Sequence, residues 1–176
     1  MLFVAIVRPH LEFGNVVWFP RYEKDKKLIE GVQRRATKII PGLKDLSYEE
    51  RLEKMKLPSL CYRRLRGDLI EAYKYTHGVY ELTDELFELE TRTNTRGHEF
   101  KLRKQRCNSG LRQHFFTQRV TDQWNNLPDD VVQAPSVNAF KNRLDSVMQQ
   151  FVYRLEVPRT TRSGQKTSSF YEKFQL

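Results

Sequence analysis

Two adjacent carboxylates, Asp129 and Asp130, come closer than any other residues in this sequence to a catalytic pattern. A pair of aspartates can hold two metal ions for phosphoryl transfer, provided that a tight hairpin between hydrophobic strands brings both carboxylates to the ions. Here the pair follows Leu127 and Pro128 between two predicted helices, where aspartates commonly serve turns and helix caps. The position therefore favours a structural role.

The other potential nucleophiles and metal ligands form no pattern of a catalytic or metal site. Cys107 and His114 lie seven residues apart, and the remaining histidines lack the spacing of a zinc knuckle or ribbon (His10, His77 and His98). The sequence contains no phosphate-binding loop, dinucleotide fingerprint or ordered Ser, His and Asp triad. We expect no catalytic centre, no metal ion and no cofactor.

The chemistry that the sequence does offer is concentrated positive charge. The chain has 31 Lys and Arg against 22 Asp and Glu, and residues 91–125 alone hold eight basic and two acidic side chains. A segregated excess favours a polyanionic partner, most often nucleic acid; a solvated basic face with a disordered tail is the alternative. The candidate binding residues belong to this block and to a second stripe: Arg34, Arg35, Lys38, Arg92, Arg96, Lys101, Arg103, Lys104, Arg106, Arg112 and Arg119.

A long helix is expected in the middle of the chain, from Ser59 as its N-cap to Gly78 as its stop. Its apolar residues recur at steps of three and four, which places them on one broad face (Cys61, Leu65, Leu69, Ala72, Tyr73 and Thr76, widened by Leu60, Tyr62 and Ile70). The opposite face carries arginines and Asp68 (Arg63, Arg64 and Arg66). We expect this helix to be the core of a bundle, because so broad a face needs several neighbours.

Further helices are expected over residues 25–40, 47–55, 111–126 and 136–151. In the first, Asp25 is the expected cap and the exposed face bears Gln33 and the basic stripe. Its expected apolar line is Leu28, Val32, Ala36, Ile39 and Ile40. In the third, Phe116 and Trp124 are expected in the core and Arg112 and Arg119 outside. The second opens on a capping box and the last on a serine cap (Ser47 with Glu50, and Ser136).

The alternation of Phe100 and Leu102 with Lys101 and Arg103 predicts a brief strand or an extended basic arm. The predicted fold class is mainly α: a small helical bundle with a short extended or β-like basic arm and a disordered C-terminal tail. The helical domain is expected over residues 1–153 and the disordered basic tail over 154–176, which has too few apolar groups to repay the entropy of ordering.

Two cysteines argue against a disulfide framework, and the apolar run over residues 1–7 is far shorter than the roughly 18 residues that a spanning helix needs. We therefore expect a nuclear or cytoplasmic chain that is neither secreted nor inserted in a membrane. Because the chain begins on this apolar run without a polar leader, it has the character of a domain cut from something longer.

Seven blocks of sequence, in order from about Val7 to about Met148, resemble the C-terminal segment of non-LTR, LINE-like retrotransposon reverse transcriptases of the chicken-repeat and jockey-like clades. The blocks are RPHLEFGNVVWFP, LIEGVQRRATKIIPGL, SYEERL, LPSLCYRRLRGDLIEAYK, TRGHEFKLRKQRCN, FFTQRVTDQWNNLPDDVV and APSVNAFKNRLD. In that family the full polypeptide carries an endonuclease, then a polymerase with metal-binding aspartates, then this region. The catalytic residues of those two domains have no counterpart positions here.

The resemblance implies a role in target-primed reverse transcription, in which element RNA is copied at a nicked chromosomal site. The chain would grip template RNA, target DNA or their hybrid through phosphates, without sequence specificity, and would contact the upstream polymerase domain. It would be no enzyme on its own. Two alternatives stay open: a non-functional structural remnant, and a protein-interaction module that uses Trp18, Phe19 and the apolar start.

Overall fold

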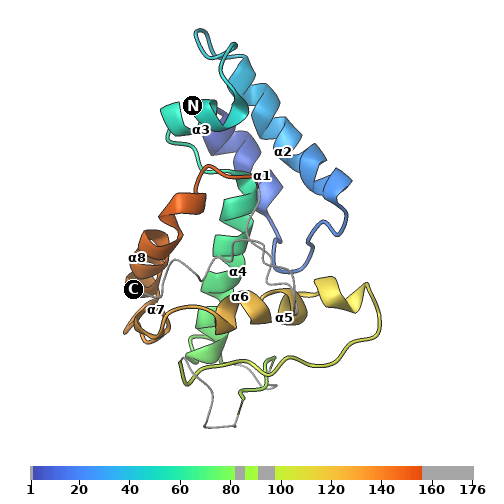
Figure 1. Cartoon of the computed structure of the whole chain (residues 1–176), viewed down its shortest axis with the longest axis vertical. Coiled ribbons are helices and arrows are strands. Elements are labelled where there is room, and N and C mark those ends of the chain that lie inside the picture. The colour runs from blue at the N-terminus through green and yellow to red at the C-terminus, as the bar shows by residue number, and fades with distance from the viewer. Residues whose placement is uncertain (1, 82–85, 91–97, 156–176) are drawn as a thin grey trace, which may run out of the picture.

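The computed structural model of the chain describes residues 2–81, 86–90 and 98–155. The described part is mainly helical, and its helices are arranged around α4 (Leu60–Thr76), which runs through the middle of the molecule (Figure 1). α8, α2, α1 and α6 all contact α4. The predicted helical fold class is confirmed. Of the predicted C-terminal tail, only Arg154 and Leu155 are described, and Leu155 packs partly against a hydrophobic cluster.

α4 begins and ends where the sequence indicates. The Ser59 hydroxyl accepts a hydrogen bond from the Tyr62 amide at 3.2 Å, and Gly78 follows the helix at φ +64°, a left-handed conformation that favours glycine. The predicted opposite face is only partly exposed, because α1 and the loop after it cover Arg64 and Asp68, both of which are buried. Those two charges belong to the interior.

The larger hydrophobic core lies between α4, α8 (Val137–Met148) and the segments that precede α8. α8 starts at Ser136, whose hydroxyl accepts from the Ala139 amide, and buries Phe140, Leu144 and Met148. The rings of Tyr73 and Phe140 stack with their centroids 4.4 Å apart. Burying each large apolar side chain stabilises the fold by about 1.5–3 kcal/mol, so this interface supplies much of the driving force.

α2 (Glu23–Lys38) buries a polar side, and the predicted apolar line is correct only in part, since Val32 and Ala36 pack partly against a hydrophobic cluster. Leu28 and Ile39 are 68% and 81% exposed, whereas Glu30, Gln33 and Thr37 are buried. The reason lies in the start of α4: the Glu30 carboxylate accepts from the Leu60 and Cys61 amides at 3.2 Å and from the Tyr48 hydroxyl at 2.7 Å. Those amides have no partner inside their own helix, so the carboxylate satisfies them. α2 also begins earlier than predicted: its N-cap is Tyr22, three residues before the predicted cap Asp25.

A smaller cluster lies at the other end of the molecule, among Phe3, Tyr48, Leu52 and Leu57. It joins the π-helical turn η1 (Phe3–Val7), α1 (Arg8–Glu12) and α3 (Tyr48–Lys54). α3 opens on the predicted capping box between Ser47 and Glu50. Of the apolar start, Phe3 is buried, while Leu2 and Ile6 stay exposed.

The helix predicted over residues 111–126 is three short pieces instead of one. A 3-10 turn η2 (Arg112–His114) is followed by α5 (Phe116–Arg119) and α6 (Thr121–Asn125), and Phe115 breaks the run with an extended backbone at ψ 149°. α7 (Asp129–Val132) and a 3-10 turn η3 (Gln149–Phe151) complete the described elements.

The paired aspartates Asp129 and Asp130 form the first turn of α7. Negatively charged side chains stabilise a helix N-terminus, which agrees with the structural role predicted for the pair. No helix in the described part of the chain is both long and apolar enough to cross a bilayer.

Candidate nucleic-acid interface

Residues 100–106, here called the arm, run extended along one end of the molecule, below α5 and α6 (Figure 1). One antiparallel bridge joins Leu102 to Leu89, with hydrogen bonds from the Glu90 amide to the Lys101 carbonyl (2.7 Å) and from the Arg103 amide to the Glu88 carbonyl (2.8 Å). The predicted extended or β-like arm is therefore present.

Two side chains at the end of α6 hold the arm by its backbone. The Leu102 amide donates to Asn125 Oδ1 and Asn125 Nδ2 donates to the Leu102 carbonyl, both at 2.8 Å, so one side chain satisfies the peptide groups that a neighbouring strand would otherwise bond. Trp124 Nε1 donates to the Phe100 carbonyl at 2.7 Å. The fixed points of the arm are neutral.

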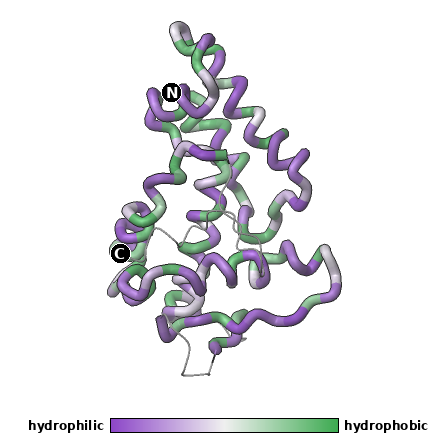
Figure 2. The backbone as a smooth tube through the Cα atoms, viewed as in Figure 1, coloured by the Kyte–Doolittle hydropathy of each residue, from purple (hydrophilic) through white to green (hydrophobic). Residues whose placement is uncertain are grey.

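The cationic side chains of the arm are left on its outside. Leu102 is buried, whereas Arg103, Lys104 and Arg106 are exposed and Lys101 is half-buried. Residues 103–106 form an unbroken hydrophilic run, visible as the purple stretch of the tube (Figure 2). The backbone is thus anchored independently of the charges, which remain available to a ligand.

Carboxylates near the arm form weak, exchangeable pairs with it. Arg103 lies 3.4 Å from Glu88 with both side chains more than half exposed, and Lys104 pairs with Asp122 at the surface. Exposed ion pairs contribute only about 0–1 kcal/mol, so a phosphate can replace either carboxylate at little cost. Arg112 Nη2 donates to Gln105 Oε1 at 3.1 Å, which extends this basic surface beyond the arm.

Arg119 does not lie outside the bundle as predicted. Its side chain is 10% exposed and forms two hydrogen bonds of 2.9 Å to the Asp68 carboxylate, which is itself 4% exposed. Nη2 also donates to the Asn15 carbonyl at 2.9 Å, and the guanidinium lies over the Phe19 ring. Burial raises the pKa of Asp68, against the opposing effect of the Arg119 hydrogen bonds. Arg119 joins α5, α4 and the loop after α1, and it is not available to phosphates.

The second predicted stripe is exposed on α2, with the Arg34 guanidinium 5.0 Å from the centre of the Tyr48 ring. Lys38 ends α2 at the top of the molecule as drawn, far from the arm along the long axis (Figure 1). The two predicted basic groups are therefore separate surfaces. Arg92 and Arg96 fall outside the described residues.

Sequence reasoning missed a group of basic and aromatic residues at the start of α2, Arg21, Tyr22 and Lys24, in which Arg21 and Lys24 lie over the Tyr22 ring. Arg21 also lies against the backbone of Gly110. Residues 21–27 read RYEKDKK, and the two acidic residues in this run lower its net charge, so a net-charge count does not single it out. The local density of four cations in seven residues was the available signal. No local pattern indicates which distant segment they meet.

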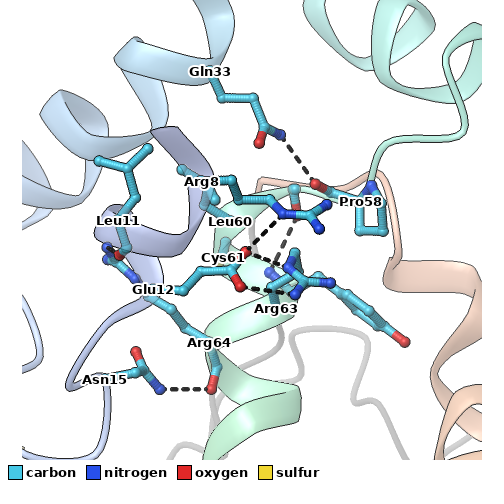
Figure 3. A network of polar contacts seen from close by, with 12 residues as sticks. Arg8, Leu11, Glu12, Asn15, Gln33, Pro58, Leu60, Cys61, Arg63 and Arg64 are labelled. Atoms are coloured by element: carbon cyan, nitrogen blue, oxygen red, sulfur yellow. Dashed lines mark hydrogen bonds and ion pairs between the residues drawn. The ribbon is translucent and has the colours of Figure 1, made fainter. Parts of the chain in front are cut away.

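A polar cavity of about 170 Å³ lies beside α4 and is lined by three arginines with Glu12, Asn15 and Gly67. Each arginine already has a protein partner: Arg63 pairs with Glu12, Arg64 donates to the Leu11 carbonyl at 3.1 Å, and Arg66 binds both oxygens of Asp145 at 2.5 and 2.8 Å. Figure 3 shows the first two of these contacts, with Arg8 beside Glu12. This cluster is consequently part of the scaffold.

The described residues contain no group of three His, Cys, Asp or Glu side chains able to hold a metal ion. The chain matches no protein-family model, no curated protein and no solved structure. Its function must therefore be argued from the geometry of its own residues.

Proposed function

We propose that this chain is a nucleic-acid-binding domain that contacts the phosphates of RNA or DNA through the arm, with Lys101, Arg103, Lys104 and Arg106 as its principal cations. The observation that supports the proposal most strongly is that different residues hold the backbone of the arm and supply its positive charge. Asn125 and Trp124 fix its backbone, while Arg103, Lys104 and Arg106 remain exposed. Little ordering of the backbone is left to do when a ligand binds, which lowers the cost of association.

The geometry suits phosphates better than base edges. Residues 103–106 span about 10 Å of extended chain, and duplex DNA carries one charge per about 1.7 Å of its axis, so several phosphates face the arm at once. Flexible cations on an extended strand carry no code for base sequence. Arg112 continues the surface, and the stripe of Arg34, Arg35 and Lys38 offers a second, distant contact for a long polyanion.

We further propose that the chain acts as the post-polymerase end of a LINE-like reverse transcriptase, gripping template RNA or target DNA during target-primed reverse transcription. The support is the seven ordered sequence blocks, two of which contain the arm and the Trp124 and Asn125 that hold it. In this proposal the upstream polymerase domain supplies all catalysis and is also a direct partner, and the chain works in the nucleus or the cytoplasm.

A second candidate function is binding of a protein, favoured by apolar side chains exposed near the N-terminus, among them Leu2, Ile6 and Val17. Trp18 is half-exposed but fixed, because Nε1 donates to the Phe13 carbonyl at 2.8 Å and Arg64 lies over the ring. Size-exclusion chromatography at rising concentration distinguishes the two functions, because an uncovered apolar interface self-associates while a phosphate-binding surface alone does not.

The test of the proposed function is binding of the purified chain to labelled RNA, duplex DNA and an RNA–DNA hybrid at low salt, followed by fluorescence anisotropy. A variant with Arg103, Lys104 and Arg106 changed to Ala is compared in parallel. We expect the variant to keep the helical circular-dichroism spectrum and to bind all three ligands more weakly. Unchanged affinity would refute the assignment to the arm.

A further inference from the structure

The segment before α2 and the segment before α5 come together at one place on the surface, although about 90 residues separate them in sequence. A Cβ atom placed on Gly110 would lie 2.8 Å from Arg21 Nη2, so the Arg21 guanidinium lies directly against the backbone of Gly110. In Figure 1 the blue loop that leads into α2 lies beside the yellow turn that leads into α5. The fold thus builds a composite surface.

This surface exposes two aromatic rings. Tyr22 is 54% and Phe115 is 55% exposed. The break in the helix at Phe115 sends two consecutive rings in different directions, since Phe116 is buried in the main core and Phe115 is not. These two exposed rings do not contribute to the core, and the face of an exposed aromatic ring can stack with another planar ring.

Two cations lie over the Tyr22 ring, and others lie close by in the sequence. The Arg21 guanidinium lies 5.2 Å and Lys24 Nζ 5.5 Å from the centre of the Tyr22 ring. Arg112 lies in the turn that ends at Phe115, and Lys27 lies one turn after Lys24 on the same face of α2.

Arg21, Lys24, Lys27 and Arg112 are all exposed, and only Glu23 and Asp25 oppose them within this stretch of α2. Lys26 pairs with Glu23 at 2.9 Å.

The surroundings of His114 also contain an excess of positive charge. Burial lowers the pKa of His114, and the nearby charges of Arg21, Lys26 and Arg119 lower it further. Arg21 and Lys26 come from the start of α2 and Arg119 comes from α5, so the positive potential is a property of the assembled surface. The surface is also continuous with the arm, because Arg112 donates to Gln105.

We propose that the composite surface of Arg21, Tyr22, Lys24, Arg112 and Phe115 binds single-stranded nucleic acid, with unpaired bases stacked on the two rings and phosphates held by the three cations. This inference rests on the proposed function and adds the class of ligand. Bases in a duplex present their faces to one another, so only an unpaired strand offers faces to Tyr22 and Phe115. A strand that continues past Arg112 reaches the arm.

The experiment compares two double variants of the full chain. Tyr22→Ala with Phe115→Ala removes both rings, and Tyr22→Phe with Phe115→Tyr keeps them. Each variant is titrated into labelled single-stranded RNA and DNA of about 15 nucleotides, the length range of a single stacking groove, and into a duplex of equal length. Urea unfolding of each variant confirms that the fold is retained.

We expect the alanine pair to weaken binding of both single strands about tenfold or more and to change duplex binding less than about twofold. The ring-retaining pair should bind like the original chain, and the comparison of RNA with DNA identifies the preferred strand. Equal losses for single strands and duplex, or no loss for either, would overturn the inference and leave the rings to a protein partner. Failure of the original chain to bind any nucleic acid would instead refute the proposed function itself.

Discussion

The arginines inside the bundle and the arginines on the arm have the same chemistry and opposite uses. Arg64 is buried and the Arg119 side chain is only 10% exposed, and each donates to backbone carbonyls or a carboxylate of another segment. Arg103 and Arg106 are exposed, on a strand that neutral side chains hold in place. The arginines that stabilise the fold and the arginines proposed to bind a ligand are therefore separated in space.

The difference shows that a count of cations overstates the charge that a ligand meets. Arg63 and Arg66 on α4 each bind a carboxylate, and Arg51 donates to the Leu46 carbonyl at 2.7 Å and to Thr37 Oγ1 at 3.3 Å. Arg63 joins α1 to α4, as Figure 3 shows together with Arg64. Arg66 joins α4 to α8, and Arg51 joins α3 to α2. The cations that remain for a polyanion are those whose loss the fold tolerates.

The largest expected effect on stability is that of Arg119→Ala. The change leaves the buried Asp68 carboxylate without its ion-pair partner, and removing one member of a buried pair costs about 3–5 kcal/mol. Urea unfolding followed by circular dichroism measures the loss. Arg112→Ala is the matched control, since this exposed arginine should change the free energy of unfolding by less than about 0.5 kcal/mol. Equal effects of the two changes would erase the distinction between interior and arm.

Asn125→Ala tests whether the neutral anchor positions the arm. The change removes both hydrogen bonds to Leu102, which should cost about 1–3 kcal/mol of stability and weaken nucleic-acid binding without removing a charge. Asn126→Ala is the control, because Asn126 bonds only to the nearby Asp122 carbonyl. If the Asn125 variant binds as tightly as the original chain, the arm needs no fixed backbone and the comparison fails.

Mild acid should loosen the arm through two histidines, His98, which is buried, and His77, which is half-buried. Burial lowers the pKa of His77, which stacks on Phe100 at 4.4 Å, and of His98, whose Nε2 lies 3.1 Å from the Trp124 carbonyl; Lys101 lowers the latter pKa further and Asp129 raises it.

Nδ1 of His98 is buried without a hydrogen-bond partner, so a proton there would be unsatisfied, whereas the Val132 backbone partly compensates a proton on His77. The unfolded chain therefore binds more protons than the folded chain, and stability is lost as the pH falls below about 6.5, the pKa of an unperturbed histidine.

Unfolding in urea at pH 7.5 and 5.5 measures this loss, which is at most about 1.4 kcal/mol per histidine for each pH unit. His98→Gln should reduce the difference between the two pH values. A pH-independent midpoint over this range would show that neither imidazole is held neutral by the fold.

The smallest expected effect is that of changing Arg34, Arg35 and Lys38 to Ala. This variant removes as many charges as the arm variant, but from a regular helix at the far end of the molecule. We expect a smaller loss of affinity than for the arm variant and no loss of stability beyond about 0.5 kcal/mol, measured by anisotropy and urea unfolding. An equal or larger loss of affinity would move the binding surface to α2.

The sequence predicts those parts of the fold that local signals determine. The capping box of α3, both ends of α4, the apolar face of α8 and the alternation in the arm all depend on residues within a few positions of one another. The buried polar contacts, in contrast, join residues that are far apart in the sequence. Glu30 reaches the start of α4 over 30 residues and Arg119 reaches Asp68 over 51, and no periodicity reveals such partners.

The same limit applies to the candidate site. Arg103, Lys104 and Arg106, three of the candidate binding residues, are exposed, since they alternate with or follow a buried leucine. Arg119 was predicted wrongly to lie outside, because Asp68 of α4 and the loop after α1 cover that side of α5. The composite surface with Arg21 and Tyr22 depends on a meeting of distant segments that only the folded chain brings about.

The most direct test of the arm as the binding surface is the salt dependence of affinity for the original chain and for the variant with Arg103, Lys104 and Arg106 changed to Ala. A plot of log affinity against log salt has a slope that counts the phosphates neutralised. We predict a steep negative slope for the original chain and a slope smaller by about 3 for the variant, one for each cation removed. Identical slopes, or no binding by the original chain at low salt, would contradict the proposal and leave the arm as a solvated surface.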